Sequence, residues 1–265
     1  MNWTPYLETA VEAARRAGIM LKDNIDTGRE ISFKGAVDIV TNFDSQAQDM
    51  IYRILSGQYP DHDFLAEEGL SMRSGSDYCW IFDPIDGTTN FAHGFPVFCV
   101  SIALEFRGVI TVGVVYDPMR EELFTAVQGG GAFLNGENIE VSSISELDKS
   151  LLSTGFPYDI RDSRENNLDN FENFVKRAQA IRRCGSAAID LCYVACSRFD
   201  GFWELKLNPW DVAAAALILE EAGGKMSDFK GKNFDIYGKQ TMGSNSLIHN
   251  QMIEVLSLPL ESPDP

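Results

Sequence analysis

An apolar run that ends in two carboxylates, at residues 80–90, sets the strictest limit on the fold of this 265-residue chain. Residues 80–82 (Trp-Ile-Phe) have the character of the end of a buried strand, and Asp83 and Asp86 follow with a proline between them. Proline presets φ for a tight turn, and residues 87–89 (Gly-Thr-Thr) then offer free backbone N–H groups. Carboxylate and carbonyl oxygens suit Mg²⁺, which shares its coordination shell with phosphate oxygens. The stretch therefore predicts a strand end that holds hard cations beside a phosphate group.

Two other interpretations of this stretch follow from its residues. Asp-Pro-x-Asp-Gly is also an ordinary turn sequence, and the pentapeptide alone does not separate a turn from a metal site. The haloacid dehalogenase class of phosphatases uses Asp-x-Asp-Gly-Thr, with its nucleophile two positions before the second aspartate. Pro84 occupies that position here, and proline cannot attack phosphorus. The sequence therefore disfavours a phospho-aspartyl mechanism.

Charge and composition restrict the classes of partner. The formal net charge of −17 argues against nonspecific binding to nucleic acid or to an anionic membrane. An anionic substrate would need bound cations that invert the local field. No run of eighteen apolar residues is present, and residues 1–5 lack the features of a signal peptide. We therefore expect a cytoplasmic protein with no membrane association.

The cysteines predict small core residues in a reducing compartment. They are odd in number and contain no Cys-x-x-Cys pair: Cys79, Cys99, Cys184, Cys192 and Cys196. Histidine occurs only at positions 62, 93 and 249, so no zinc set assembles.

Residues 1–145 are predicted to form an α+β half. A helix is expected over residues 4–22 with Thr4 as N-cap, then a strand over 31–40 broken at 34–35. Thr41 or Asn42 caps a second helix. A short strand near residues 64–65 ends in Glu67 and Glu68, and its end is expected to share a sheet edge with the end of the strand before Asp83. Strands at 96–106, 109–116 and 122–133 form an antiparallel meander.

Residues 146–265 are predicted to form a second, α/β half, with the boundary in the polar segment 142–150. Strands are expected at 151–155, 180–181 and 202–204, and they alternate with helices near 168–179 and 187–198. An alanine-rich helix begins at residues 210–212 and ends at the Gly-Gly pair 223–224. Asp211 therefore lies in the first turn of this helix, where an acid also matches the helix dipole.

Together, the acidic residues at the ends of the predicted strands and at the starts of the predicted helices form a pattern that is typical of a known family. The chain resembles the inositol monophosphatase family of Mg²⁺-dependent, lithium-sensitive phosphatases. The resemblance runs through residues 37–44, 67–68, 80–91, 185–188, 201–204 and 210–224. Two of these segments are specific to that family, namely residues 83–88 (Asp-Pro-Ile-Asp-Gly-Thr) and the Trp-Asp pair that opens the alanine-rich helix.

The resemblance implies three overlapping sets of site residues. The metal set holds two to three Mg²⁺ ions: Glu67, Asp83, the carbonyl of Ile85, Asp86 and Asp211. The catalytic set activates the attacking water: Glu67, Thr88 and Asp44. The substrate set contacts the phosphate and the alcohol portion: Asp86, Gly87, Thr88, Ala187, Glu204 and Asp211.

The implied fold is a layered αβαβα sandwich, with an antiparallel sheet in the first half and a mixed sheet in the second. The implied activity is hydrolysis of myo-inositol monophosphates by in-line attack of water, in a homodimer. A broader sugar or nucleotide phosphatase remains an alternative, acting on fructose 1,6-bisphosphate, an NADP 2′-phosphate or 3′-phosphoadenosine 5′-phosphate. A regulatory protein with RNA or transcription partners is a further alternative, for which Arg182 and Arg183 would offer a surface.

Overall fold

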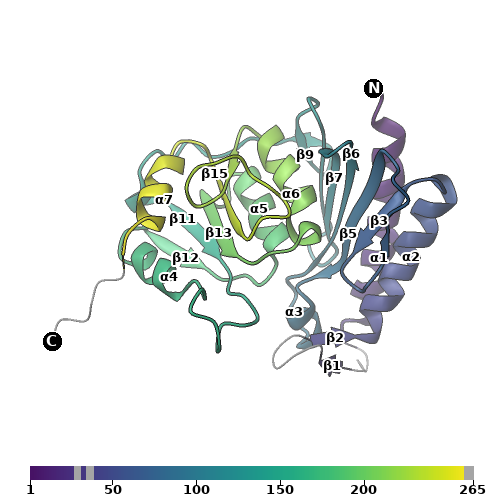
Figure 1. The fold of residues 1–265 in the computed structure, drawn as a ribbon, viewed down its shortest axis with the longest axis horizontal. Coiled ribbons are helices and arrows are strands. Elements are labelled where there is room, and N and C mark those ends of the chain that lie inside the picture. The colour runs from purple at the N-terminus through teal and green to yellow at the C-terminus, as the bar shows by residue number, and fades with distance from the viewer. Residues whose placement is uncertain (27–30, 34–38, 260–265) are drawn as a thin grey trace.

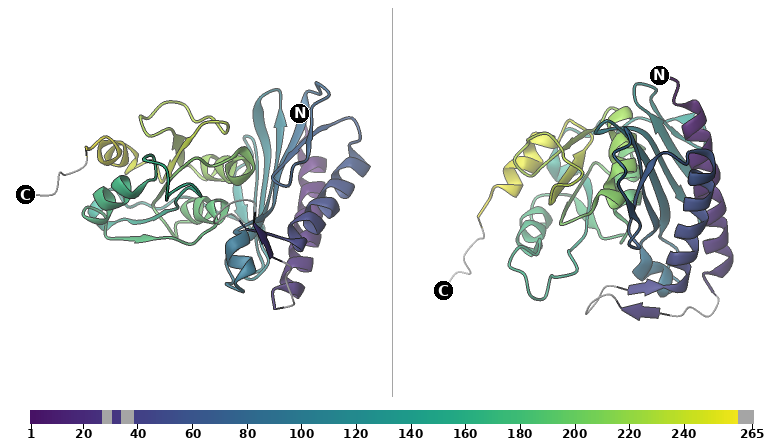
Figure 2. Two further views of the ribbon diagram at one scale, coloured as in Figure 1. Left: turned by 60° about the horizontal axis from the view of Figure 1, so that its bottom comes forward. Right: turned by 45° about the vertical axis from the view of Figure 1, so that its right-hand side comes forward.

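Five layers, in the order α-β-α-β-α, make up the molecule (Figure 1). The computed structural model describes residues 1–26, 31–33 and 39–259. Two long helices, α1 (Thr4–Asn24) and α2 (Asn42–Gln58), cover the outer face of the first sheet (Figure 2). None of the helices in these described segments combines the length and apolar character needed to cross a membrane. The predicted sandwich is confirmed.

The first sheet has eight strands in the order β10-β9-β8-β7-β6-β5-β3-β4. Their bounds are β3 (Asp63–Ala66), β4 (Ser71–Met72), β5 (Tyr78–Asp86), β6 (Cys99–Phe106), β7 (Val109–Asp117), β8 (Glu122–Val127), β9 (Ala132–Leu134) and β10 (Glu137–Asn138). The predicted meander is confirmed, since β5 to β10 pair antiparallel. One pairing departs from the predicted antiparallel sheet, because β3 pairs parallel with β5 and makes the sheet mixed. The reversal through β4 carries the chain back, so that β5 runs in the direction of β3.

The two N-terminal helices begin differently. The predicted N-cap of α1 is wrong, because Thr4 is already helical and Trp3 is the N-cap without a side-chain bond. The cap of α2 is confirmed at Thr41, whose hydroxyl accepts the Phe43 N–H at 3.2 Å. Before α2, β1 (Ile31–Phe33) and β2 (Ile39–Thr41) pair antiparallel. The predicted strand break at 34–35, and residues 37–38 of the family pattern, lie outside the described residues.

The second sheet is mixed, with the strand order β12-β11-β13-β15-β14. Its strands are β11 (Leu151–Thr154), β12 (Ala180–Arg182), β13 (Gly201–Leu205), β14 (Lys225–Ser227) and β15 (Gln240–Ser244). Helices α4 (Leu168–Val175) and α7 (His249–Leu256) cover its outer side (Figure 1). The first sheet ends at Asn138 and the second begins at Leu151, on either side of the predicted boundary. A division into subdomains 1–145 and 146–265 stays a prediction.

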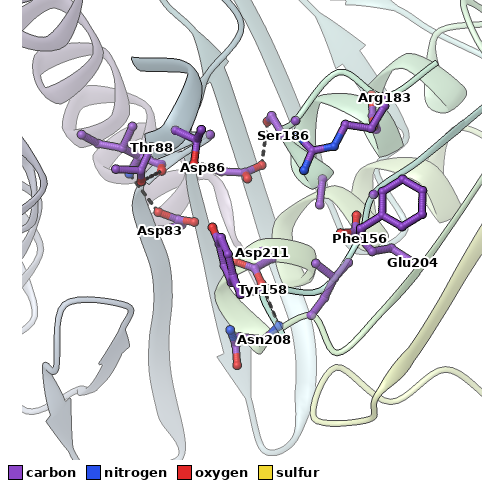
Figure 3. A pocket seen from close by; sticks show the side chains of 18 of the residues that line it. Asp83, Asp86, Thr88, Phe156, Tyr158, Arg183, Ser186, Glu204, Asn208 and Asp211 are labelled. Carbon is purple, nitrogen blue, oxygen red and sulfur yellow. Dashed lines mark hydrogen bonds between the residues drawn. The ribbon is translucent and has the colours of Figure 1, made fainter. Parts of the chain in front are cut away.

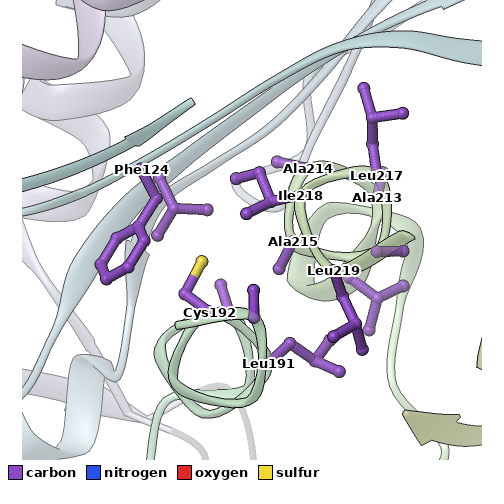
Figure 4. Close-up of a cluster of buried hydrophobic side chains, with 14 of the residues drawn as sticks. Phe124, Leu191, Cys192, Ala213, Ala214, Ala215, Leu217, Ile218 and Leu219 are labelled. Atoms are coloured by element: carbon purple, nitrogen blue, oxygen red, sulfur yellow. The ribbon is translucent and has the colours of Figure 1, made fainter. Parts of the chain in front are cut away.

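Helices α5 (Ala187–Ala195) and α6 (Pro209–Glu221) form the central layer (Figure 4). The four consecutive alanines of α6, residues 213–216, are at most 4% exposed. A Cβ at Gly113 on β7 would meet the Ala214 carbonyl oxygen at 2.6 Å, so small residues on both sides allow the helix to approach the sheet closely. The cysteines are free thiols, as predicted, and Cys79, Cys99 and Cys192 are buried.

Candidate active site

The predicted site residues converge on one cavity between the first sheet and the second half of the chain (Figure 3). Its walls include nine of them: Glu67, Asp83, Ile85, Asp86, Gly87, Thr88, Ala187, Glu204 and Asp211. Asp44 is absent from the wall and lies behind Thr88, to which it is hydrogen-bonded. Residues far apart in the sequence therefore contribute to a single site.

The parallel pairing of β3 with β5 sets the acidic edge of this cavity. Ala66 pairs with Phe82, so the next residues along the two strands, Glu67 and Asp83, follow at the same sheet edge. The predicted shared edge is thus confirmed. Beyond Asp83 the register of β5 shifts before Asp86, and the Ile85 N–H donates to Asp83 Oδ1 at 2.8 Å. At this irregularity the chain turns away from the line of the strand, toward Gly87 and the start of the next helix.

Asp86 is fixed by the start of α5. Its Oδ2 accepts hydrogen bonds from the Ser186 hydroxyl and from the Ala188 N–H, both at 2.7 Å. Ser186 is also the N-cap of α5, where its hydroxyl accepts the Ile189 N–H. One serine therefore aligns a helix and a site carboxylate together. This contact joins the edge of the first sheet to the second half.

The short helix α3 (Thr88–Ala92) lies against the same junction. Gly87 precedes it with a φ of 102°, and a Cβ there would meet the Val97 and Gly185 carbonyl oxygens at 3.0 and 3.2 Å. Only glycine combines this conformation with such close backbone contacts. Asn90 donates to the carbonyls of Val97 and Cys184 at 2.7 and 2.8 Å, which ties α3 to the loop before α5.

Thr88 and Asp44, two members of the predicted catalytic set, form a hydrogen-bonded pair. The Thr88 hydroxyl lies 3.0 Å from Asp44 Oδ1 and 2.9 Å from the Ile85 carbonyl oxygen. Asp44 is fully buried, and its Oδ2 accepts the N–H and the hydroxyl of Thr41 at 2.7 and 2.6 Å. Burial raises the pKa of Asp44 although these hydrogen bonds oppose the shift. Asp44 thus serves both the α2 capping box and the site.

Buried carboxylates dominate the electrostatics. Burial raises the pKa of Asp83 well above its usual value, and the charges of Glu67 and Asp86 raise it further. Burial and then the charge of Asp86 likewise raise the pKa of Asp211 well above its usual range, although the Asn208 N–H donates to its Oδ2 at 2.7 Å. Acids that repel one another in a buried site favour a proton or a cation between them.

The donor set fits a hard divalent cation. Its members are carboxylates and one backbone carbonyl, the oxygen ligands that Mg²⁺ prefers. Within the described segments, no group of three or more His, Cys, Asp or Glu side chains is arranged to enclose an ion as it stands. The assignment of individual ligands therefore rests on the chemistry and placement of these oxygens and stays a prediction.

Several cavity residues escaped the sequence analysis. They include Tyr158, Arg183, Ser186, Asp190 and Asn208. Arg183 was assigned to an outer surface, yet it is the only cationic side chain among the described residues that line the cavity. Asp190 is 2% exposed, and its Oδ1 has no hydrogen-bond partner among the described residues. Asp190 follows Ser186 by four residues and therefore lies on the same helix face, and this spacing could have predicted that Asp190 lines the cavity.

The end of the cavity near Glu204 holds opposite charges. Burial raises the pKa of Glu204 to about 8, the Asp190 carboxylate adds to this rise, and the Arg183 guanidinium opposes it. Burial also raises the pKa of Asp190 well above its usual value, whereas the nearby Cys184 thiol and Arg183 lower it. Figure 3 shows Arg183, Phe156 and Glu204 on the side of the cavity away from Asp83 and Thr88.

Comparison with known proteins agrees with this geometry. The model of the inositol monophosphatase family matches residues 2–258. An inositol-1-monophosphatase of Synechocystis sp. is 45% identical over 254 residues, which are 95% of this chain and 88% of that protein. The Nus factor SuhB of Pseudomonas aeruginosa is 46% identical over 238 residues, covering 86% of this chain and 87% of its own. The structure of inositol monophosphatase from Anabaena (Nostoc) sp. PCC 7120 matches with a TM-score of 0.90 and 40% identity, over 98% of each chain.

The fold, the acidic cavity and these likenesses define a phosphatase that cleaves phosphoric monoesters. The chain belongs to the inositol monophosphatase family.

Proposed function

We propose that this phosphatase hydrolyses myo-inositol monophosphates with Mg²⁺, by direct attack of water on phosphorus. The observation that carries the proposal is the convergence of Glu67 and Asp83, side by side at one sheet edge, with Asp86 and Asp211 from other elements. The relative from Synechocystis, whose name states this activity, supports the choice of substrate.

The metal ligands proposed are the acids of the cavity and one carbonyl. Glu67, Asp83 and the Ile85 carbonyl would hold one Mg²⁺ ion, and Asp83 would share a second with Asp86 and Asp211. When bound, Mg²⁺ lowers the pKa of water and offsets the negative charge of the phosphoryl group. The hydrogen bonds that Ser186 and Ala188 donate hold Asp86 in place for this role, and they oppose the rise in its pKa that burial causes.

Thr88 and Asp44 are proposed to orient the attacking water and to draw away its proton. The Thr88 hydroxyl can accept a hydrogen bond from water while it donates to Asp44, which lies behind it. Glu67, on the cavity wall, is a second candidate proton acceptor. The N–H groups of Gly87 and Thr88 lie at the start of α3, where no helical partner exists for them, and they would bind phosphate oxygens.

The alcohol portion of the substrate would lie toward Glu204 and Ala187, with Asp86 and Asp211 at its inner side. Because the pKa of Glu204 is raised to about 8, its carboxyl group is protonated over much of the neutral range. It can therefore donate and accept hydrogen bonds, which suits hydroxyl-rich substrates. Fructose 1,6-bisphosphate and the two nucleotide phosphates remain alternative substrates.

The experiment is phosphate release from myo-inositol 1-phosphate with Mg²⁺, compared with fructose 1,6-bisphosphate and with the Asp83→Asn variant. The proposal predicts faster turnover of the inositol ester and loss of turnover in the variant. Preference for the bisphosphate would refute the inositol assignment, and full activity of the variant would refute the role of Asp83. Inhibition by millimolar lithium is expected from the family resemblance, and its absence would contradict that expectation.

A second candidate function is a regulatory role in transcription, favoured by the 46% identity to the Nus factor SuhB. Arg182 and Arg183 are both exposed, but Arg183 also lines the cavity, and the net charge of −17 opposes direct contact with RNA. A pull-down with the tagged chain that recovers no RNA polymerase subunit and no RNA would remove this candidate.

The assembly and location of the protein are also part of the proposal. We infer a homodimer in the cytoplasm, on the family resemblance and on five cysteines that remain free thiols. Light scattering coupled to size-exclusion chromatography measures the mass in solution, and a monomeric mass would contradict the dimer.

A further inference from the structure

We propose that Gly155 is a specificity-determining residue, because its missing side chain provides the space in which the Glu204 carboxyl group lies. This inference rests on the proposed function and assigns a role to a residue outside the predicted site. A Cβ at Gly155 would overlap the Cδ, Oε1 and Oε2 atoms of Glu204, each closer than the 3.0 Å that real Cβ atoms essentially never show. The φ of Gly155 lies outside the left-handed region, so the backbone itself does not require glycine. Glycine is therefore needed at this position for the room that it leaves beside Glu204, and not for a backbone turn.

The register of the second sheet brings these two residues together. β11 and β13 are parallel neighbours in which Thr154 pairs with Trp203. Gly155 and Glu204 are the next residues along each strand and follow at the same edge. This is the arrangement that Glu67 and Asp83 have in the first sheet, since both pairs follow matched positions of two parallel strands. The neighbourhood of Gly155 and Glu204 is thus a direct consequence of strand pairing.

A buried network prevents the Gly155 loop from moving away. Asn167 donates from Nδ2 to the Gly155 carbonyl at 2.7 Å, and its Oδ1 accepts the Trp203 indole N–H at 2.9 Å. The Thr154 hydroxyl donates to the Trp203 carbonyl at 2.6 Å. Thr154, Asn167 and Trp203 are at most 3% exposed. If a methyl group were added at Gly155, the flexible Glu204 side chain would move and the backbone would stay.

The Glu204 carboxyl group is placed by packing and charge. Burial and the charges of Asp190, Arg183 and Asp86 act on it, and no hydrogen bond to another described residue is among these influences. Both of its oxygens are therefore available to the hydroxyl groups of a substrate. The same lack of an anchor makes the carboxyl position sensitive to the space above Gly155. Gly155 thus acts as a positioning residue for the recognition of the alcohol portion.

The test compares Gly155→Ala with wild-type protein on two phosphate esters. Myo-inositol 1-phosphate presents hydroxyl groups to Glu204, whereas p-nitrophenyl phosphate presents none. We expect kcat/KM for the inositol ester to fall about tenfold or more, while kcat/KM for the aryl ester changes less than about twofold. Gly57→Ala is the matched control, because a Cβ at Gly57 meets nothing within 4 Å and its φ also lies outside the left-handed region. The control should leave both substrates unaffected.

A rescue experiment separates displacement of Glu204 from general damage. Glu204→Asp shortens the side chain by one methylene and withdraws its carboxyl group from the space above Gly155. Gly155→Ala should therefore cost less in the Glu204→Asp background than in the wild-type background. Additive effects, or an equal loss with both esters in Gly155→Ala, would overturn the inference.

The proposed function can fail separately from this inference. If the wild-type protein hydrolyses p-nitrophenyl phosphate and not the inositol ester, the inositol assignment is refuted. The same five proteins are then compared on the sugar phosphate that the wild type does hydrolyse. Calorimetric binding of the product myo-inositol, which has no phosphate ester to hydrolyse, gives the same comparison without turnover, and equal affinities for wild type and Gly155→Ala would overturn the inference.

Discussion

Replacing Glu204 with glutamine is expected to stabilise the metal-free protein at neutral pH. The pKa of Glu204 is raised from 4.5 to about 8 in the folded protein, first by burial and then by the charge of Asp190. The unfolded chain loses this proton above its ordinary pKa, whereas the folded protein retains it up to about pH 8. The folded state therefore binds more protons across this window, and the free energy of unfolding must fall as the pH rises through it.

The size of the effect follows from the width of the window. Each pH unit between the two pKa values corresponds to about 1.4 kcal/mol, so the penalty at pH 7 has an upper limit of about 3 kcal/mol. Because the side chain is partly exposed to the cavity, we expect about 1 to 3 kcal/mol. Glutamine keeps the shape and the hydrogen-bonding groups but cannot ionise. The variant should therefore gain this stability at pH 7 and almost none at pH 4.5.

Urea unfolding with EDTA, at half-unit steps from pH 4.5 to pH 8, measures this difference. Glu12→Gln controls for the loss of one negative charge, because the Glu12 side chain is 50% exposed and pairs with Arg16 one turn away. Wild type and Glu12→Gln should show the same pH dependence, and Glu204→Gln a flatter one. Parallel curves for wild type and Glu204→Gln would refute the argument that burial of this acid is costly.

Three further outcomes test other parts of the structure. Asp83→Asn should abolish the rise in Tm that Mg²⁺ causes and lower turnover by at least about 10²-fold, and an unchanged Mg²⁺ effect in differential scanning fluorimetry would contradict its role as a ligand. Asp44→Asn should lower kcat by about 10²- to 10⁴-fold with little change in KM. The same variant should lose about 1 kcal/mol of stability with the capping box of α2, as urea unfolding would show. Burial lowers the pKa of His249 to about 4, so the unfolded state binds the extra proton between about pH 6.5 and 4, and stability should fall by up to about 3 kcal/mol as the pH drops through that range. His249→Asn should remove this part of the pH dependence, and an unchanged acid limb would contradict it.

Much of the fold was predictable because local patterns decided it. Alternation and turn residues identified the meander from β6 to β8, and alanine spacing with a closing glycine pair identified α6. The acids at the ends of β3 and β5 were also predictable as a pair, since both follow short apolar runs. These features depend on residues that are close in sequence, or on one simple pairing.

The features that the sequence could not show depend on strand pairing between segments that are far apart in the chain. The neighbourhood of Gly155 and Glu204 depends on the pairing of Thr154 with Trp203, which no local pattern reveals. Arg183 is exposed, as its place beside Arg182 suggested, but the chain turns at Gly185, which has a φ of 91°, and Arg183 also lines the cavity. The shared edge of β3 and β5 was predicted, but the strand that produces their parallel direction, β4, was not, because no local pattern shows how it carries the chain back.

The shared helix α6 has a consequence for synthesis on the ribosome. The strands of the first sheet have all been translated by Asn138, yet the helix that covers their inner face is Pro209–Glu221. Ile81, Val115 and Phe124, which are buried in the core that α6 completes, therefore lack this cover for several seconds at about 5–20 residues per second. A nascent chain of this protein should need a holding chaperone during that interval. A chain stopped near residue 145 should aggregate, although every strand of its sheet is present.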